Sequence, residues 1–251
     1  MQKTVFITGA TAGFGKAMAE RYAREGWRLV LTGRRKERLD ELKAELAPAP
    51  VATLCFDVRD RTACEKAVAS LPAEFADIDV LVNNAGLALG LEPVQECDLN
   101  DWETMIDTNI KGLTYITRAI LPGMVKRDTG HVVNLGSVAG NYPYPGGNCY
   151  GGTKAFVNHF SKNMRADLLG TKVRVTCIEP GMCVTEFSVV RFKGDKEAAD
   201  KVYEGTQSIT PEDIAECVYW ATTLPAHVNI NELEVMPVQQ AFSPFAVSRD
   251  K

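Results

Sequence analysis

Three residues that can do acid–base chemistry stand at a spacing that brings them together. Tyr150 and Lys154 lie four residues apart in a stretch with helical periodicity, and Ser137 ends the strand pattern before it. A phenol that exchanges a proton near pH 7 needs a pKa well below its free value of ~10. A cation ~4 Å away at an effective dielectric of ~20 contributes ~4 kcal/mol, or ~3 pKa units, so Lys154 could supply most of that shift. Two solvent-exposed residues on one face of a helix, without a catalytic role, fit the same spacing.

A glycine-rich turn near the start of the chain is a candidate phosphate site. Gly9, Gly13 and Gly15 follow the first strand pattern and open a helix, with Thr11 and Phe14 between them. Glycines let a backbone approach a pyrophosphate, and a helix N-terminus supplies free N–H groups and a positive dipole. A tight strand-to-helix turn without a ligand is the alternative.

Two arginines follow the second strand pattern, where an NAD enzyme carries an acidic residue for the ribose 2′-hydroxyl. A planar guanidinium suits a 2′-phosphate, so Arg34 and Arg35 favour NADP(H) over NAD. A solvated basic helix start is the alternative. Basic residues at a helix N-terminus oppose the helix dipole, so a bound anion would help to explain them.

Small and polar residues follow the next two strand patterns. Asp57, followed by Val58, could accept a hydrogen bond from an adenine amino group. The short side chains of Asn84, Ala85 and Gly86 would let the chain lie against a cofactor. Each segment also fits an ordinary loop start.

The elements that must position these residues follow from alternating patterns. Short, β-branched apolar runs predict strands at residues 4–8, 28–32, 51–58, 80–83, 131–135, 173–178 and 232–236. Helical periods with a polar outer face predict helices at 15–25, 35–46, 61–70, 102–126, 150–168 and 211–224. Because strands that are apolar on both faces belong in a parallel sheet covered on both sides, we predict a Rossmann-type, doubly wound α/β fold.

The composition predicts one soluble domain over residues 1–251. The chain has 28 basic and 32 acidic residues and no block of like charge, so its charge pattern does not indicate binding to nucleic acid or to an anionic membrane. Seven scattered cysteines indicate neither disulfides nor a metal site, and favour a reducing cytoplasm. Residues 182–208 break the periodicity and predict an irregular substrate lid, and residues 238–251 form a short tail.

These motifs together resemble the short-chain dehydrogenase/reductase family over residues 3 to 237. The resemblance implies that Tyr150 is the general acid/base and that Ser137 hydrogen-bonds the substrate carbonyl. It further implies that Lys154 binds the nicotinamide ribose and that Asn109 holds a water in the proton relay. The remaining positions, implied to line the nicotinamide side, are Pro180, Gly181 and Thr185. Hydride transfer with NADP(H) then needs no metal.

Within that family, several stretches resemble bacterial NADP-dependent 3-hydroxy acid dehydrogenases, whereas residues 142–145 and 240–246 are closer to sulfoacetaldehyde reductases. Both resemblances imply a short aldehyde or alcohol that carries an anion, so the pocket needs a cation or fixed donors. Arg191 is the first candidate, although a surface position on the lid fits it equally. Tyr144, Asn148 and Gln240 could add hydrogen bonds to the substrate.

The sequence therefore predicts an NADPH-dependent oxidoreductase that interconverts a short anionic aldehyde and its alcohol, of the malonic semialdehyde type. One alternative is a sulfoacetaldehyde reductase that forms isethionate. A second, of another class, is a non-catalytic sensor or scaffold that binds NADP. The family resemblance also implies a homotetramer formed through the long helices at 102–126 and 150–168.

Overall fold

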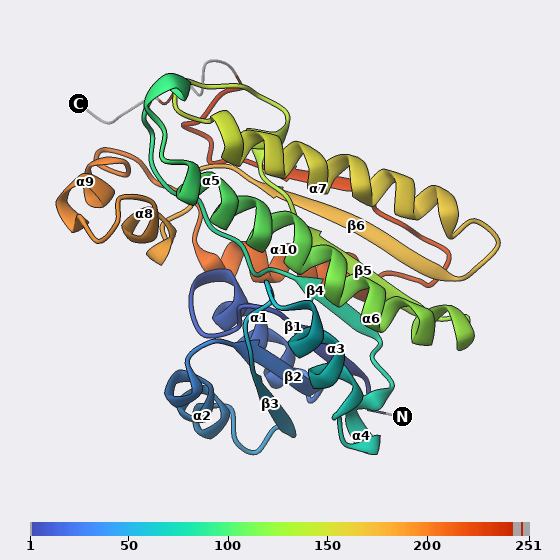
Figure 1. Ribbon diagram of the computed structural model, residues 1–251. Coiled ribbons are helices and arrows are strands. Elements are labelled where there is room, and N and C mark those ends of the chain that lie inside the picture. The colour runs from blue at the N-terminus through green and yellow to red at the C-terminus, as the bar shows by residue number, and fades with distance from the viewer. Residues whose placement is uncertain (1, 243–246, 248–251) are drawn as a thin grey trace.

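A parallel sheet of seven strands forms the centre of the protein in a computed structural model that describes residues 2–242 and 247 (Figure 1). The strand order is β3-β2-β1-β4-β5-β6-β7, so the chain reverses its direction of winding between β1 and β4. Such a switch point opens a crevice at the carboxyl ends of the strands. The strands are β1 (Thr4–Ile7), β2 (Arg28–Gly33), β3 (Val51–Cys55), β4 (Val80–Asn83), β5 (Gly130–Leu135), β6 (Val173–Pro180) and β7 (Glu232–Val235).

Helices cover both faces of the sheet, so the predicted doubly wound α/β fold is confirmed. One face packs against α1 (Gly13–Arg24), α2 (Lys36–Glu45) and α10 (Pro211–Thr223). The other packs against α3 (Arg61–Ala69), α4 (Ala73–Ala76), α6 (Leu113–Lys126) and α7 (Asn148–Asp167). Central strand residues such as Phe6 and Leu31 are fully buried, which explains why the strands read as continuous apolar runs.

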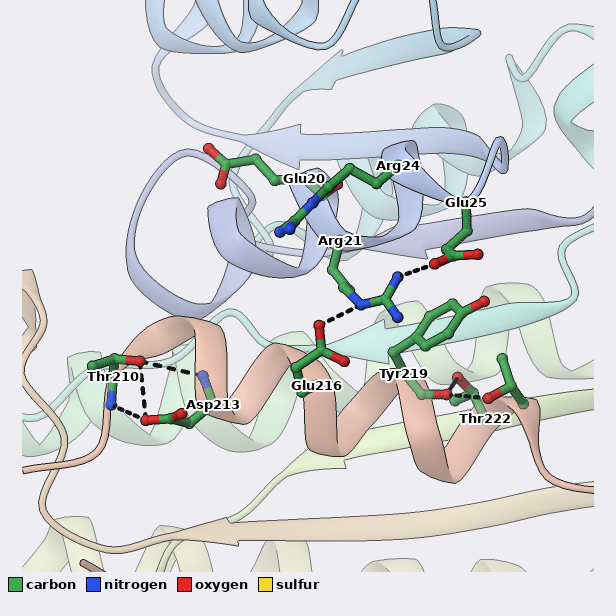
Figure 2. Close-up of polar contacts among 10 residues, drawn as sticks. Glu20, Arg21, Arg24, Glu25, Thr210, Asp213, Glu216, Tyr219 and Thr222 are labelled. Carbon is green, nitrogen blue, oxygen red and sulfur yellow. Dashed lines mark hydrogen bonds and ion pairs between the residues drawn. The ribbon is translucent and has the colours of Figure 1, made fainter.

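The helix that opens at the glycine-rich turn is held in place by α10 (Figure 2). Arg21 of α1 pairs with Glu216 of α10 at 2.5 Å, and its guanidinium lies 3.8 Å from the ring centroid of Tyr219. A capping box between Thr210 and Asp213 begins α10. These contacts fix the direction of α1 and therefore the position of the turn at its start.

The predicted helix at 102–126 is wrong in one respect, because a wide turn interrupts it. The chain forms α5 (Leu99–Ile106), a π-helical segment η2 (Asp107–Gly112) and then α6. A Cβ at Gly112 would lie 2.8 Å from Val58 Cγ2, so the turn packs against the loop after β3. Such π-helical turns are frequent at functional sites.

The lid segment, residues 182–208, is more regular than predicted. It contains two short helices, α8 (Glu186–Arg191) and α9 (Lys196–Lys201), which Figure 1 shows in orange at one side of the molecule. Lys193 and Gly194 separate them with positive φ angles of 52° and 97°. The lid is tied to α2 by Arg38–Glu186 at 3.3 Å and to α5 by Lys193–Asp101 at 2.7 Å.

The chain also forms two short 3₁₀ turns, η1 (Val94–Glu96) and η3 (Val138–Gly140). Of the predicted tail, residues 243–246 and 248–251 lie outside the described residues. In the described part of the chain, no helix combines the length and apolar character needed to cross a membrane.

Candidate active site

A cavity of about 380 Å³ opens at the carboxyl ends of the strands. It is lined by every predicted cofactor residue except Gly15 and by all three predicted acid–base residues. The predicted residues that line it are Gly9, Thr11, Gly13, Phe14, Arg34, Arg35, Asp57, Val58, Asn84, Ala85, Gly86, Ser137, Tyr150, Lys154, Pro180, Gly181 and Thr185. Segments up to 176 positions apart in the sequence thus meet in one crevice at the predicted edge of the sheet.

The glycine-rich turn needs its glycines for two different reasons. Gly9 and Gly13 have φ angles of 64° and 49°, which favour glycine. Gly15 is buried in α1, where a Cβ would collide with the carbonyl of Gly9. Asn84 then fixes the turn from β4, because its Nδ2 donates to the carbonyl of Thr8 at 2.8 Å. Gly15 therefore shapes the wall without lining the cavity.

Basic side chains gather at the end of β2. Arg35 Nη2 donates to Thr11 Oγ1 at 2.9 Å, and Arg34 lies 3.9 Å from the carboxylate of Asp57. Asp57 also accepts from Arg59 Nη2 at 2.7 Å. Partial burial raises the pKa of Asp57, but the hydrogen bonds from Arg59 outweigh it and hold that pKa below its usual range. Two guanidinium groups thus face the cavity beside an ionised carboxylate.

Ser137, Tyr150 and Lys154 line the cavity together, as their spacing predicts. Ser137 begins η3, where its Oγ accepts from Ala139 N at 3.1 Å and donates to Pro180 O at 3.4 Å. Tyr150 and Lys154 are both buried on one face of α7. Lys154 Nζ donates to Leu135 O at 2.7 Å, and burial lowers its pKa to about 8.

The structure does not show the predicted lowering of the Tyr150 pKa by Lys154. Burial raises the pKa of Tyr150, while a hydrogen bond with Ser137 and the charge of Arg191 lower it. Lys154 Nζ lies 5.9 Å from the ring centroid of Tyr150 and is turned towards Leu135 O. The Lys154 ammonium group therefore donates to a backbone carbonyl. Without a bound cofactor, the side chains that lower the pKa of Tyr150 are Ser137 and Arg191.

Asn109 lies in η2 and is 2% exposed. Its Oδ1 accepts from Leu87 N at 2.9 Å, and its Nδ2 donates to Leu87 O at 2.8 Å and to Thr153 Oγ1 at 3.0 Å. This amide therefore joins the π-helical turn to the loop after β4 and to α7. Asn109 lies beside Gly86, which lines the cavity, so its position is compatible with the predicted role at the site.

Arg191 reaches the active-site aromatic residues from the end of α8. Its Nη2 donates to Tyr144 Oη at 2.7 Å and its Nε to Gly90 O at 3.3 Å. The guanidinium carbon lies 5.6 Å from the ring centroid of Tyr150. Of the predicted substrate residues, Arg191 and Tyr144 therefore lie together next to Tyr150.

The amides of the other two predicted substrate residues are bound to neighbouring loops. Asn148 Nδ2 donates to Glu92 O at 3.1 Å and to Cys97 Sγ at 3.2 Å. Gln240 Oε1 accepts from Met182 N at 2.7 Å, which ties the tail to the base of the lid behind Gly181. Like Arg191 and Tyr144, neither residue is among those that line the cavity itself, and their contact with substrate stays a prediction.

Several lining residues were not predicted, among them four on the lid. Phe187 and Val190 line the cavity from α8, and the ring of Phe187 lies 5.5 Å from that of Tyr150. Their spacing of three, directly after the N-cap Thr185, is a helical signal, but six residues are too few to establish a period. Leu87, Thr108 and Cys183 complete this side of the cavity.

A family model described as short chain dehydrogenase matches residues 3–196, more than half of the chain. The chain belongs to the short-chain dehydrogenase family. The resemblance read from the motifs is thereby confirmed.

Named relatives of this short-chain dehydrogenase match it over nearly its full length. An NADP-dependent 3-hydroxy acid dehydrogenase YdfG from Salmonella typhi is 61% identical over 98% of this chain and 99% of its own. A serine 3-dehydrogenase from Agrobacterium fabrum is 56% identical over 100% of both chains. A solved closed form of serine dehydrogenase complexed with NADP+ has a TM-score of 0.93 at 59% identity, covering 98% of this chain and 100% of that one.

Proposed function

We propose that this short-chain dehydrogenase catalyses the NADP(H)-dependent interconversion of a short hydroxy acid and its aldehyde. The observation that carries the proposal is the shared cavity: the glycine-rich turn, the two arginines, Ser137 and Tyr150 all line it, with Arg191 beside Tyr150. Relatives named for 3-hydroxy acids and serine, and a neighbour complexed with NADP+, support it.

The residues at the cavity wall fit a 2′-phosphorylated dinucleotide. A Cβ at Gly9 would lie 3.0 Å from Ala85 Cα, so a side chain at this position would crowd the cavity wall. Glycine keeps this part of the cavity open. Arg34 and Arg35 stand at the end of β2, where a ribose 2′-phosphate would lie, and supply the donors that it needs. Lys154 would hold the nicotinamide ribose, and Pro180, Gly181 and Thr185 would line the nicotinamide side.

When bound, NADP(H) would supply the hydride in reduction and accept it in oxidation. Tyr150 Oη gives a proton to the developing alkoxide in reduction and removes it in oxidation. Ser137 holds the reacting oxygen, because its Oγ is already fixed by Ala139 N and Pro180 O. Asn109 keeps the loop after β4 beside these groups through its paired bonds to Leu87.

Arg191 is the residue that we assign to the substrate anion. It is the cation that the lid presents to Tyr150, and its present partner is the neutral hydroxyl of Tyr144. A carboxylate or sulfonate accepts more strongly from a guanidinium than a phenol does. The substrate anion would therefore take the place of Tyr144 as the acceptor.

Initial rates of NADP+ reduction test this function with 3-hydroxypropionate, L-serine, isethionate and the neutral 1-propanol. We expect the acids to be oxidised with a far higher kcat/KM than 1-propanol. Arg191→Met should raise KM for the acids by roughly 10- to 100-fold and leave 1-propanol unchanged. Lys196→Met, at an exposed position on α9 of the lid, is the control.

The same panel separates the alternatives. A preference for isethionate over 3-hydroxypropionate would favour the sulfonate substrate. Oxidation of 1-propanol as efficiently as the acids, unchanged in Arg191→Met, would contradict the assignment of Arg191. If the protein binds NADP+ but oxidises none of these alcohols, the result would instead support the alternative of a non-catalytic sensor or scaffold that binds NADP.

A further inference from the structure

A buried carboxyl group lies directly behind the turn that carries Ser137. Glu179 is the next-to-last residue of β6 and is only 1% exposed. Within the part of the chain that the structure describes, no ion pair joins it to a basic side chain, and its Oε1 has no hydrogen-bond partner. Burial raises the pKa of Glu179, and the charges of Glu232 and Glu234 raise it further, whereas hydrogen bonds with Asn141 and Cys177 lower it.

The other oxygen of this carboxyl group holds the far end of the turn. Asn141 directly follows η3, the turn that Ser137 begins. Glu179 Oε2 accepts from Asn141 Nδ2 at 2.7 Å, and the exposed Glu234 Oε2 on β7 accepts from the same donor at the longer distance of 3.1 Å. Asn141 Oδ1 accepts in turn from Asn158 Nδ2 at 2.8 Å. Asn158 lies one helical turn after Lys154 on the buried face of α7. The contacts therefore run from β6 through the turn to the helix of Tyr150 and Lys154.

The near end of the turn packs against the same residue. A Cβ at Gly136, the residue before Ser137, would lie 3.1 Å from Glu179 Cγ. On the opposite side, a Cβ at Gly140 would lie 2.8 Å from the carbonyl carbon of Lys154. Residues 136–141 are thus enclosed between the side chain of Glu179 and the backbone of α7.

We infer that Glu179 is a positioning residue, which fixes Ser137 relative to Tyr150 by holding residues 136 and 141 against the end of β6. The carboxyl group does not touch the cavity and acts only through the turn. A displacement of a reacting group by about 1 Å can cost on the order of 100-fold in rate. The inference rests on the proposed chemistry at Ser137 and Tyr150, but not on the assignment of Arg191.

Two substitutions at Glu179 separate position from charge. Glu179→Leu removes the acceptor and keeps the approximate size, and Glu179→Gln keeps an acceptor oxygen and removes the charge. We expect Glu179→Leu to lower kcat by roughly 10- to 100-fold with the NADPH dissociation constant and Tm little changed. Glu179→Gln should restore kcat to within about threefold of the parent. The control is Glu65→Gln on α3, whose exposed carboxylate binds Arg61 at 2.9 Å away from this cluster and should leave kcat unchanged.

A double-mutant cycle with Ser137→Ala tests whether the effect passes through Ser137. If Glu179 acts by positioning that hydroxyl, Glu179→Leu should change kcat by less than about threefold in the Ser137→Ala protein. Asn141→Ala, at an exposed position, should repeat the loss in the parent and its disappearance in the Ser137→Ala protein. It provides the same test if Glu179→Leu does not fold.

Equal losses in both backgrounds would overturn the inference, as would a Glu179→Gln protein no more active than Glu179→Leu. All variants are measured on the alcohol that the parent oxidises fastest, neutral or anionic. Failure of the anion preference would therefore contradict the proposed function alone, and the cycle would still report on Glu179.

Discussion

At the scale of single residues, turnover is expected to depend most strongly on the hydroxyl of Tyr150. Tyr150→Phe keeps the ring that packs beside Phe187 and removes only the group that exchanges a proton. General acid–base catalysis contributes about 10²- to 10⁴-fold, so kcat should fall by that amount with NADPH affinity kept. Steady-state rates and NADPH fluorescence titrations measure the two quantities. Turnover close to that of the parent would exclude Tyr150 as the general acid/base.

Lys154 is expected to make the stability of the dinucleotide-free protein depend on pH. Burial lowers its pKa from 10.5 to about 8, so the unfolded chain binds more protons than the folded chain between those values. The penalty for the buried ammonium is complete below pH 8 and is relieved as the pH rises to 10.5. The free energy of unfolding of the parent, relative to Lys154→Met, should therefore rise by up to about 3 kcal/mol across this window.

Urea denaturation of both proteins at a series of pH values measures this difference. Buried tyrosines and cysteines also titrate at alkaline pH, but they are present in both proteins and cancel in the comparison. A difference that does not change with pH would mean that Lys154 keeps its ordinary pKa in the folded protein.

At the scale of elements, the junction between β2 and α2 is expected to set the choice of dinucleotide. Each hydrogen bond from a guanidinium to phosphate contributes about 1.5–3 kcal/mol. Arg34→Ala combined with Arg35→Ala should therefore raise the dissociation constant for NADPH by on the order of 100-fold or more and change that for NADH little. Fluorescence titrations with both dinucleotides test this, and Lys36→Ala, which removes the exposed Lys36–Asp40 pair, is the control. Equal changes for NADPH and NADH would leave the arginines without a role in selection.

The same scale shows what the sequence can and cannot predict. The strands were predictable because residues such as Val30 and Leu81 are buried whichever face they point to. The predicted strand at 51–58 runs too far, since Asp57 and Val58 line the cavity beyond the last paired residue. The π-helical turn could not be predicted, because its contacts, such as that of Asn109 with Leu87, join residues that are 22 positions apart in the sequence.

Site residues divide in the same way. Those next to strand ends, such as Ser137 and Arg34, were predictable, since parallel strands bring their carboxyl ends to one edge. The partners of Asn148 and Gln240 could not be predicted, because an amide in a loop can bind any nearby backbone group, and only the tertiary structure shows which. The burial of Glu179 could not be predicted, because it lies one residue beyond the predicted strand at 173–178, where a glutamate is usually exposed.

At the scale of the whole molecule, α6 and α7 cover the same face of the sheet (Figure 1), and the cavity opens at the strand ends. The family resemblance implies a tetramer formed through these two helices. Ala155 is exposed on α7, where a glutamate from each copy would be buried against its neighbour if the copies meet there. Light scattering should therefore give four chains for the parent and fewer for Ala155→Glu.

The control for this prediction is Ala44→Glu, an exposed alanine on α2 in the opposite helical layer, which should remain tetrameric. Because the cavity is built by one chain from the described residues, the dissociated Ala155→Glu protein should still bind NADPH with an affinity close to that of the parent. A tetrameric Ala155→Glu protein would place the contact between copies elsewhere. Loss of NADPH binding on dissociation, with the fold intact by circular dichroism, would instead mean that a neighbouring chain helps to shape the cavity.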